Sequence, residues 1–166
     1  DRLDADMVSL AKRMAKSATA GAIRPFRVNG SEEWFIMFCN SLCFRDLKTD
    51  STILQANREA GVRGRDNPIF KDSDLIYDGV IIREVPEIAV ISGVGDSSSD
   101  VAPNFMCGAQ AAGVAYAQRT RARFQTDDYG YRQGVAVEEI RGVEKLMYNS
   151  VQHGVTTVYA SAPADS

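Results

Sequence analysis

The side chains that most often carry chemistry are scarce in this sequence. It contains one histidine, His153, and three cysteines, Cys39, Cys43 and Cys107. His153 precedes a glycine at an expected turn, and no second histidine is available for a metal cluster. Cys39 and Cys43 have three residues between them, but they span the end of an expected strand, which favours buried, inert thiols over a zinc site. The sequence therefore predicts no metal and no cofactor.

Glycine-rich and acidic patterns also fall short of a catalytic set. Gly93-Val94-Gly95 lacks the third glycine of a dinucleotide loop, and residues 108–113 lack the Lys and Ser/Thr of a phosphate-binding loop. Three carboxylate pairs could supply an acid and a base, but each lies beside a turn or on a polar face, where most are solvated. These pairs are Asp72/Asp74, Asp127/Asp128 and Glu138/Glu139. We expect no catalytic activity, and a small enzyme with an acidic cleft remains the alternative.

Arg119, Arg121 and Arg123 alternate along the chain, so on a strand all three would point to one face. Such a face could meet the phosphates of DNA, or carboxylates of a neighbouring subunit, where arginine is favoured. The alternative is a solvent-facing strand with salt bridges inside the chain, which the acidic total favours. A monomeric binding module that uses this arginine face is a further alternative.

Length and composition predict one compact α+β unit over residues 1–166. The hydrophobic fraction of 45% can supply a core, and a chain of this length buries roughly 70% of its surface on folding. With 19 basic against 22 acidic residues, the formal charge of −3 argues against a general nucleic-acid binder. An odd number of cysteines fits synthesis in a reducing cytoplasm, and no apolar run is long enough to predict a membrane span.

The first half of the chain predicts helices around a hairpin. An apolar stripe of Leu3, Met7, Leu10 and Met14 predicts a helix ending near Gly21. Residues 26–28 and 34–38 read as a β-hairpin whose Asn29-Gly30 forms a type I′ turn, an interpretation preferred to the formal glycosylation sequon Asn29-Gly30-Ser31. The second of these strands is apolar on both faces and is expected to be central. Short helices follow at 42–47 and at 51–60, the second capped by Ser51.

The second half predicts strands, one helix and a long polar loop. A loop is expected at 63–68, and a further polar loop at 92–103 is expected to be mobile. The Ala/Gly-rich segment 107–117 predicts a helix closely packed on a sheet. Strands are expected at 79–85, 88–91, 120–125, 134–140, 143–148 and 155–162. The mixture predicts an α+β architecture rather than a regular β-α-β wind.

The order of several short motifs resembles the major capsid proteins of tailed phages, of the type found in the podophage N-four. The matching stretches lie at residues 23–30, 34–38, 45–47, 66–70, 77–82, 107–111, 128–130 and 134–145, and include Arg45-Asp46-Leu47, Asp66-Asn67-Pro68, Tyr77-Asp78-Gly79 and Cys107-Gly108-Ala109-Gln110-Ala111. Together they span roughly four-fifths of the chain, and ordered independent motifs reinforce one another. At Cys39-Asn40-Ser41 the sequence departs from the family, which usually carries His-Pro after the strand.

The resemblance implies the tailed-phage major capsid fold, with a peripheral and an axial domain, of which this chain would be a C-terminal portion. Loop 92–103 would then be the tip of the axial domain. The implied function is structural: self-association into pentameric and hexameric capsomers and a shell that encloses double-stranded DNA. Scaffold, portal or decoration proteins are further implied partners, and no membrane is. The protein would be made in the bacterial host cytoplasm and reside in the virion capsid, with Arg119, Arg121 and Arg123 as candidate subunit or DNA contacts.

Overall fold

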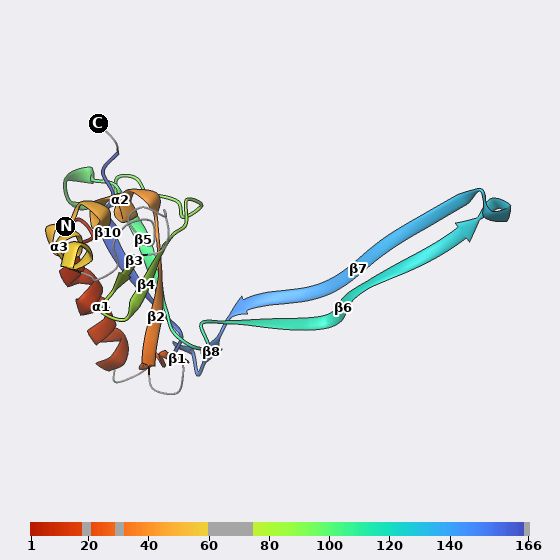
Figure 1. The fold of residues 1–166 in the computed structure, drawn as a ribbon, viewed down its shortest axis with the longest axis horizontal. Helices are drawn as coiled ribbons and strands as arrows, with labels where there is room; N and C mark the ends of the chain where they lie inside the picture. The colour runs from red at the N-terminus through yellow and green to blue at the C-terminus, as the bar shows by residue number, and fades with distance from the viewer. Residues whose placement is uncertain (18–20, 29–31, 60–74, 165–166) are drawn as a thin grey trace.

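The computed structural model describes residues 1–17, 21–28, 32–59 and 75–164. In Figure 1 a body of helices and strands carries one long projecting hairpin. The helices are α1 (Ala5–Ser17), α2 (Ser41–Thr49) and α3 (Ser51–Glu59), with short 3₁₀ turns at η2 (Asp96–Ser98) and η3 (Asp128–Gly130). The strands are β1 (Phe26–Val28), β2 (Glu32–Cys39), β3 (Leu75–Tyr77), β4 (Val80–Glu84), β5 (Val101–Cys107), β6 (Ala112–Asp127), β7 (Arg132–Lys145), β8 (Met147–Tyr148), β9 (Val151–Gln152) and β10 (Val155–Ser161).

The body is built on a mixed sheet in the order β10-β5-β2-β4-β3, with β1 also paired to β2. Strand β2 lies between antiparallel β5 and parallel β4, so the predicted hairpin and the central position of its second strand are confirmed. A parallel pair needs a crossover connection, and α2 and α3 lie in the chain between β2 and β4. The predicted type I′ turn and the sequon at residues 29–31 lie outside the described residues.

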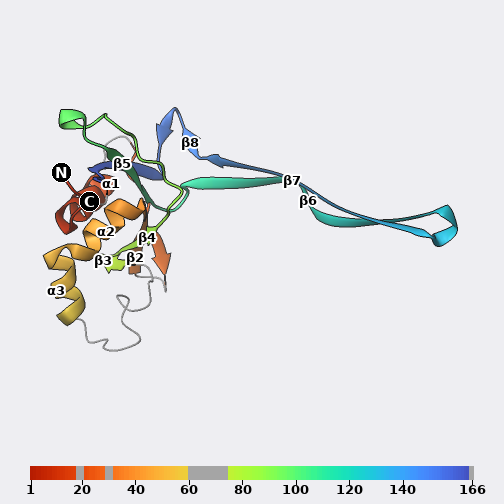
Figure 2. The same cartoon turned by 90° about the horizontal axis from the view of Figure 1, so that it is seen from above.

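One face of this sheet carries the core. Alternate residues of β2, Phe35, Met37 and Cys39, are fully buried, while the residues between them are half-buried. Val80 and Ile82 of β4 continue the buried layer on the neighbouring strand. The helices lie along one side of the sheet (Figures 1 and 2), where α1 meets β10 and α2 meets β4. This period-two burial is what one covered sheet face produces.

Helix α1 uses a different face from the one that the sequence predicts. The buried residues are small: Ala5, Val8, Ala11 and Ala15. Leu10 and Met14 of the expected stripe are 46% and 55% exposed, so that prediction is wrong for them, although Leu3 is buried just before the helix. Small side chains bring the helix axis closer to its neighbours than leucine and methionine would. The helix begins where the Asp4 carboxylate accepts a hydrogen bond from the Met7 amide at 2.8 Å.

Both short helices after β2 are confirmed, and asparagine and aspartate side chains cap them. The Asn40 side chain accepts a hydrogen bond from the Leu42 amide, which satisfies one of the unpaired amides at the start of α2. At α3 the cap is Asp50, not the predicted Ser51. The Asp50 carboxylate accepts hydrogen bonds from the amides of Thr52 at 2.7 Å and Ile53 at 3.2 Å. The predicted last residue of this helix, Ala60, and the loop predicted at 63–68 lie outside the described residues.

The predicted strand at 79–85 is confirmed as β4, but the predicted strand at 88–91 is wrong. After Pro86 the chain turns, and Ile91 forms only an isolated bridge to Val101. The polar loop is shorter than predicted, because β5 begins at Val101 and residues 101–103 are already paired with β10. Within the loop the Asp100 carboxylate accepts a hydrogen bond from the Gly93 amide. Ser97 and Ser98 take left-handed backbone conformations there.

The predicted helix at 107–117 is also wrong: this segment is the end of β5, a tight connection and the start of β6. Its small residues do allow close packing, as expected. The segments that pack closely are irregular connections and not a helix on a sheet. A Cβ on Gly108 would lie 2.4 Å from the Arg24 carbonyl oxygen, and one on Gly154 would lie 2.5 Å from Ala111. Ala109 donates to the Arg24 carbonyl at 2.7 Å. These contacts come from residues distant in sequence, so local spacing could not reveal them.

Three strands predicted at 120–125, 134–140 and 143–148 belong largely to one hairpin, β6 with β7, with β8 after it. Asp128–Gly130 forms the 3₁₀ turn η3 between them, and the final predicted strand, at 155–162, is confirmed as β10. The architecture is α+β, as predicted. Among the described residues, no helix is long and apolar enough to cross a membrane.

Candidate functional site

The longest surface feature is the hairpin β6–β7, named here the arm. In the arm β6 and β7 pair with each other from end to end. The pairing runs from Ala112 opposite Lys145 to Asp127 opposite Arg132. Sixteen residues of β6 at about 3.3 Å each give a reach of about 50 Å. Figures 1 and 2 both show the arm leaving the body, with its outer half away from the other described helices and strands. Its surface is therefore open to other polypeptide.

Two irregularities divide the arm into an inner and an outer half. The register shifts between Tyr116 and Gln118 and again between Gln118 and Arg121, in each case with an extra residue on β6. A bulge leaves the extra residue unpaired and bends the strand. Figure 1 shows the resulting bend midway along β6. Two bulges restore the alternation of faces, so the inner and outer halves keep a common pair of faces.

One face of the outer half, the charged face, is built around Glu138. Its carboxylate accepts a hydrogen bond from Arg121 Nε at 3.0 Å and lies 2.9 Å from Arg121 Nη2. Arg123 Nε lies 3.4 Å from the same oxygen, and Gln118 Nε2 donates to it at 3.1 Å. All these groups are partly exposed, so the pairs are weak in water, on the order of 0–1 kcal/mol each.

Arg119 does not join that cluster. It falls in the bulged stretch between the Gln118 and Arg121 pairs, and it forms no ion pair with any residue the structure describes. The structure thus brings together Arg121 and Arg123 but not all three predicted arginines. The sequence did not identify Glu138 as the partner of these arginines. Only the register between the two strands, which places Glu138 opposite Arg121, reveals it.

The other face of the outer half, named here the apolar face, carries two directly opposed apolar pairs, with Thr126 opposite Gln133 beyond them toward the tip. Ala122 lies opposite Val137, and Phe124 lies opposite Val135. Phe124, Val135 and Val137 are 78%, 65% and 69% exposed, values that are unusual for large apolar side chains on neighbouring strands. On the inner half the opposed pair Val114 and Val143 lies on the same face, separated from the outer pairs by the ion-paired Glu139 and Arg141. The pattern of either strand alone does not reveal this face, because the face depends on how the two strands are paired.

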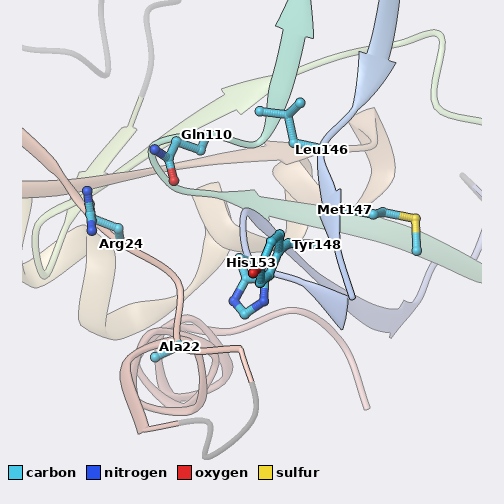
Figure 3. A pocket seen from close by; sticks show the side chains of 7 residues that line it. All are labelled: Ala22, Arg24, Gln110, Leu146, Met147, Tyr148 and His153. Atoms are coloured by element: carbon cyan, nitrogen blue, oxygen red, sulfur yellow. The ribbon is translucent and has the colours of Figure 1, made fainter. Parts of the chain in front are cut away.

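A pocket of about 470 Å³ lies at the root of the arm (Figure 3). Its lining residues come from the connection before β1, the turn before β6 and the segment after β7: Ala22, Arg24, Gln110, Leu146, Met147, Tyr148 and His153. The rings of Tyr148 and His153 lie 6.3 Å apart and tilted. His153 thus lies in a pocket beside apolar and aromatic side chains. No group of three or more metal-ligating side chains gathers among the residues that are described.

The other residues with possible chemistry are dispersed. Glu138 and Glu139 sit on opposite faces of β7, where Glu139 pairs with Arg141 at 3.2 Å, so they cannot act as an acid and base pair. Asp127 and Asp128 lie at the exposed tip of the arm, and the pair Asp72/Asp74 lies outside the described residues.

The cysteines are structural. Cys39 and Cys43 are free thiols with no exposed surface, and Cys107 is half-buried. Burial raises the pKa of all three thiols. The Cys43 thiol also accepts a hydrogen bond from the buried Asn104 amide at 3.5 Å.

Comparison with known proteins identifies relatives over the whole described fold. A family model described as phage capsid protein matches residues 1–164. The major capsid protein of Pseudomonas phage KPP25 is 29% identical over 154 residues, covering 84% of this chain and 41% of that protein. The chain resembles the capsid of cyanophage Pam1 with 41% identity and a TM-score of 0.84, covering 99% of this chain and 48% of that one.

The capsid of Ralstonia phage GP4 is similar as well, with 25% identity and a TM-score of 0.69 over 100% of this chain and 49% of that one. The chain therefore spans less than half the length of each of these three relatives. The fold is that of phage capsid proteins, as the order of sequence motifs predicted. With a family match over nearly its full length, the chain belongs to the phage capsid protein family.

Proposed function

We propose that this chain is part of a major capsid protein that associates with further copies of itself into pentameric and hexameric capsomers. These capsomers close into a shell around packaged double-stranded DNA, so the protein resides in the virion after synthesis in the host cytoplasm. The observation that carries the proposal is the agreement in sequence and fold with the Pam1 capsid over 99% of the chain. The role is structural rather than catalytic, and the dispersal of the acidic pairs supports this. Scaffold, portal and decoration proteins are further proposed partners.

Within this proposal, residues 1–166 form one α+β unit of a longer polypeptide. The loop ending at Asp100 is proposed as the tip of the axial domain. This loop is rich in polar residues and directly precedes β5. The charged face is proposed to meet a neighbouring subunit or the phosphates of DNA. The single carboxylate of Glu138 forms ion pairs with both Arg121 and Arg123. This cluster therefore keeps a net positive charge. Arg119 adds a further charge close by.

Sedimentation of the full-length protein under native conditions tests the function. A capsid subunit is expected to form large oligomers, whereas a small enzyme or a monomeric binding module would sediment as single chains. The contribution of the arginines is tested by replacing Arg119, Arg121 and Arg123 together by glutamine in the full-length protein. The thermal midpoint should change little, because exposed pairs contribute little. Shell formation or DNA retention should fall.

Arg13→Gln is the matched control, since Arg13 is an exposed arginine on α1 and its replacement should leave both readouts unchanged. If the triple variant unfolds markedly earlier but assembles normally, the arginines serve folding and the proposed contact is wrong.

A further inference from the structure

The outer edge of β10 carries backbone groups that have no partner in the part of the chain that the structure describes. β10 is the last strand at one end of the mixed sheet, where it pairs with β5. Backbone groups along a strand point to alternate sides, and the Ser161 amide points outward, because it donates to the Asp1 carbonyl at 2.9 Å. The amides and carbonyls of Val155, Thr157 and Tyr159 therefore also point outward, where they form no hydrogen bond to another described residue.

Two further observations agree with this direction. Tyr159 lies opposite Pro103, which has no amide hydrogen, so these two residues cannot exchange a pair of hydrogen bonds between β10 and β5. On the other side, the Gly154 carbonyl accepts a hydrogen bond from the Gly108 amide at 2.9 Å, next to the first pair of the β5–β10 ladder. Even-numbered residues thus face β5, and the open edge consists of residues 155, 157 and 159.

The composition of this edge is that of a strand with a neighbour on both sides. Residues 155–159 are Val-Thr-Thr-Val-Tyr, all strong strand formers, with no charged residue and no proline. Their register with β5 is continuous, so no bulge turns the edge away. Natural edge strands use charges, prolines or bulges to prevent pairing with other chains, and this edge has none of them.

We infer that the segment of the capsid polypeptide directly before Asp1 forms a parallel strand along the outer edge of β10. The first step of this pairing is present, since Arg2 forms a parallel bridge with Ser161. Leu3 is fully buried and fixes the chain at this point, and α1 then runs back beside β10 (Figure 1). In the same register, about six preceding residues would reach Val155.

The inference rests on the proposed function, in which these residues are a C-terminal portion of a longer capsid protein. The three relatives described above have enough further chain, since this chain covers 41–49% of their lengths.

The connectivity of the chain favours this segment over a strand from a second copy. Asp1 and Arg2 already occupy the Ser161 end of the edge, and their direction is parallel to β10. The preceding residues are therefore held beside Tyr159 by the covalent chain, which gives them a high effective concentration at the edge. A strand from a second copy would have to displace them.

Residue-resolved hydrogen exchange of the full-length protein tests the pairing. It is measured by mass spectrometry with electron-transfer fragmentation, on a dilute sample that sedimentation shows to be monomeric. The amides of Thr156 and Val158 face β5 and are the internal reference. We expect the outward amides of Thr157 and Tyr159 to exchange within about tenfold of this reference rate. The parallel register also predicts protection of the second and fourth residues before Asp1, whose amides would face β10.

Outward amides that exchange on the order of a hundredfold faster than the reference would overturn the inference. Protection that appears only as the protein concentration rises would also overturn it, and would identify a second copy as the partner of the edge.

Two neighbouring threonines provide a matched pair of proline variants in the full-length subunit. Proline has no amide hydrogen, and an edge strand tolerates it where that amide would face solvent. Thr156→Pro removes a hydrogen bond to β5, and Thr157→Pro removes the inferred hydrogen bond to the preceding segment. We expect both variants to lower the thermal midpoint of the monomer by several degrees. A midpoint for Thr157→Pro close to that of the wild type would contradict the pairing.

The exchange measurement needs no variant, so it decides the question if either variant fails to fold. Both measurements use the monomer and do not depend on shell formation, so a failure of the proposed function would be seen separately.

Discussion

At the scale of single residues, the side chain of Asn104, on the buried face of β5, joins three elements through hydrogen bonds. It has no exposed surface, and its Nδ2 donates to the carbonyls of Ala102 and Val158 at 3.3 and 3.4 Å. Its Oδ1 accepts a hydrogen bond from the Asn40 amide at 3.2 Å. One buried amide thus ties β5 to β10 and to the start of α2. Such a residue is retained only where its hydrogen bonds are made, because burying it without partners is costly.

Replacing Asn104 by leucine should lower the free energy of unfolding by roughly 1–3 kcal/mol. The substitution keeps the side-chain size but leaves the Asn40 amide without its acceptor in the protein interior. Chemical denaturation followed by circular dichroism gives the value. An unchanged midpoint would mean that water or another group satisfies Asn40, against the network described.

The cysteines give a second prediction at this scale. Burial raises the pKa of Cys39 and Cys43, so both stay as neutral thiols near neutral pH, and only the thiolate reacts with alkylating reagents. We expect no labelling of either residue by iodoacetamide in the native protein and full labelling after unfolding. Mass spectrometry of the peptides distinguishes the sites. Labelling of native Cys39 at the rate of a free thiol would show that the end of β2 is open to solvent.

At the scale of elements, the sequence predicted strands better than the faces of helices. β2, β4 and β10 were recognisable because their apolar runs are bounded by turn residues. The buried face of α1 was missed, since its long apolar side chains Leu10 and Met14 point away from the sheet. Alanine carries almost no signal in a hydrophobic pattern, yet alanine is what the close packing of this helix requires.

The two faces of α1 can be told apart by substitution. Ala11→Leu inserts bulk where Ala11 is 4% exposed and should destabilise the protein by about 1–3 kcal/mol. Met14→Ala on the open face should change stability by no more than about 0.5 kcal/mol. Thermal unfolding of both variants gives the comparison. A larger loss for Met14→Ala would reinstate the apolar stripe predicted from the sequence.

The arm shows a different limit of prediction at the same scale. Its strands were largely predicted, but its faces depend on cross-strand register and on two bulges that local pattern does not encode. The three arginines looked equivalent because they alternate in sequence. In the structure Arg121 and Arg123 share Glu138, whereas Arg119 is set apart by the bulge. Register is a property of two segments together, so one strand read alone could not reveal it.

At the scale of the whole molecule, the body and the arm differ in how much apolar surface they bury. The body buries one face of a mixed sheet under helices and carries its own core of apolar residues. The arm buries almost nothing within the described chain and exposes the charged face and the apolar face, the second of which also carries the Glu139–Arg141 ion pair. A projecting element of this kind fits the proposed capsid role, in which copies of the protein contact one another. Length and composition do not predict this division, since they indicate only one compact unit.

The most direct test of the central claim is electron microscopy of the full-length gene product expressed alone. The proposed function predicts closed shells of uniform size, in which fivefold and sixfold capsomers are visible. Single particles of one chain, or only irregular aggregates, at concentrations and salt conditions that keep the protein folded would contradict it.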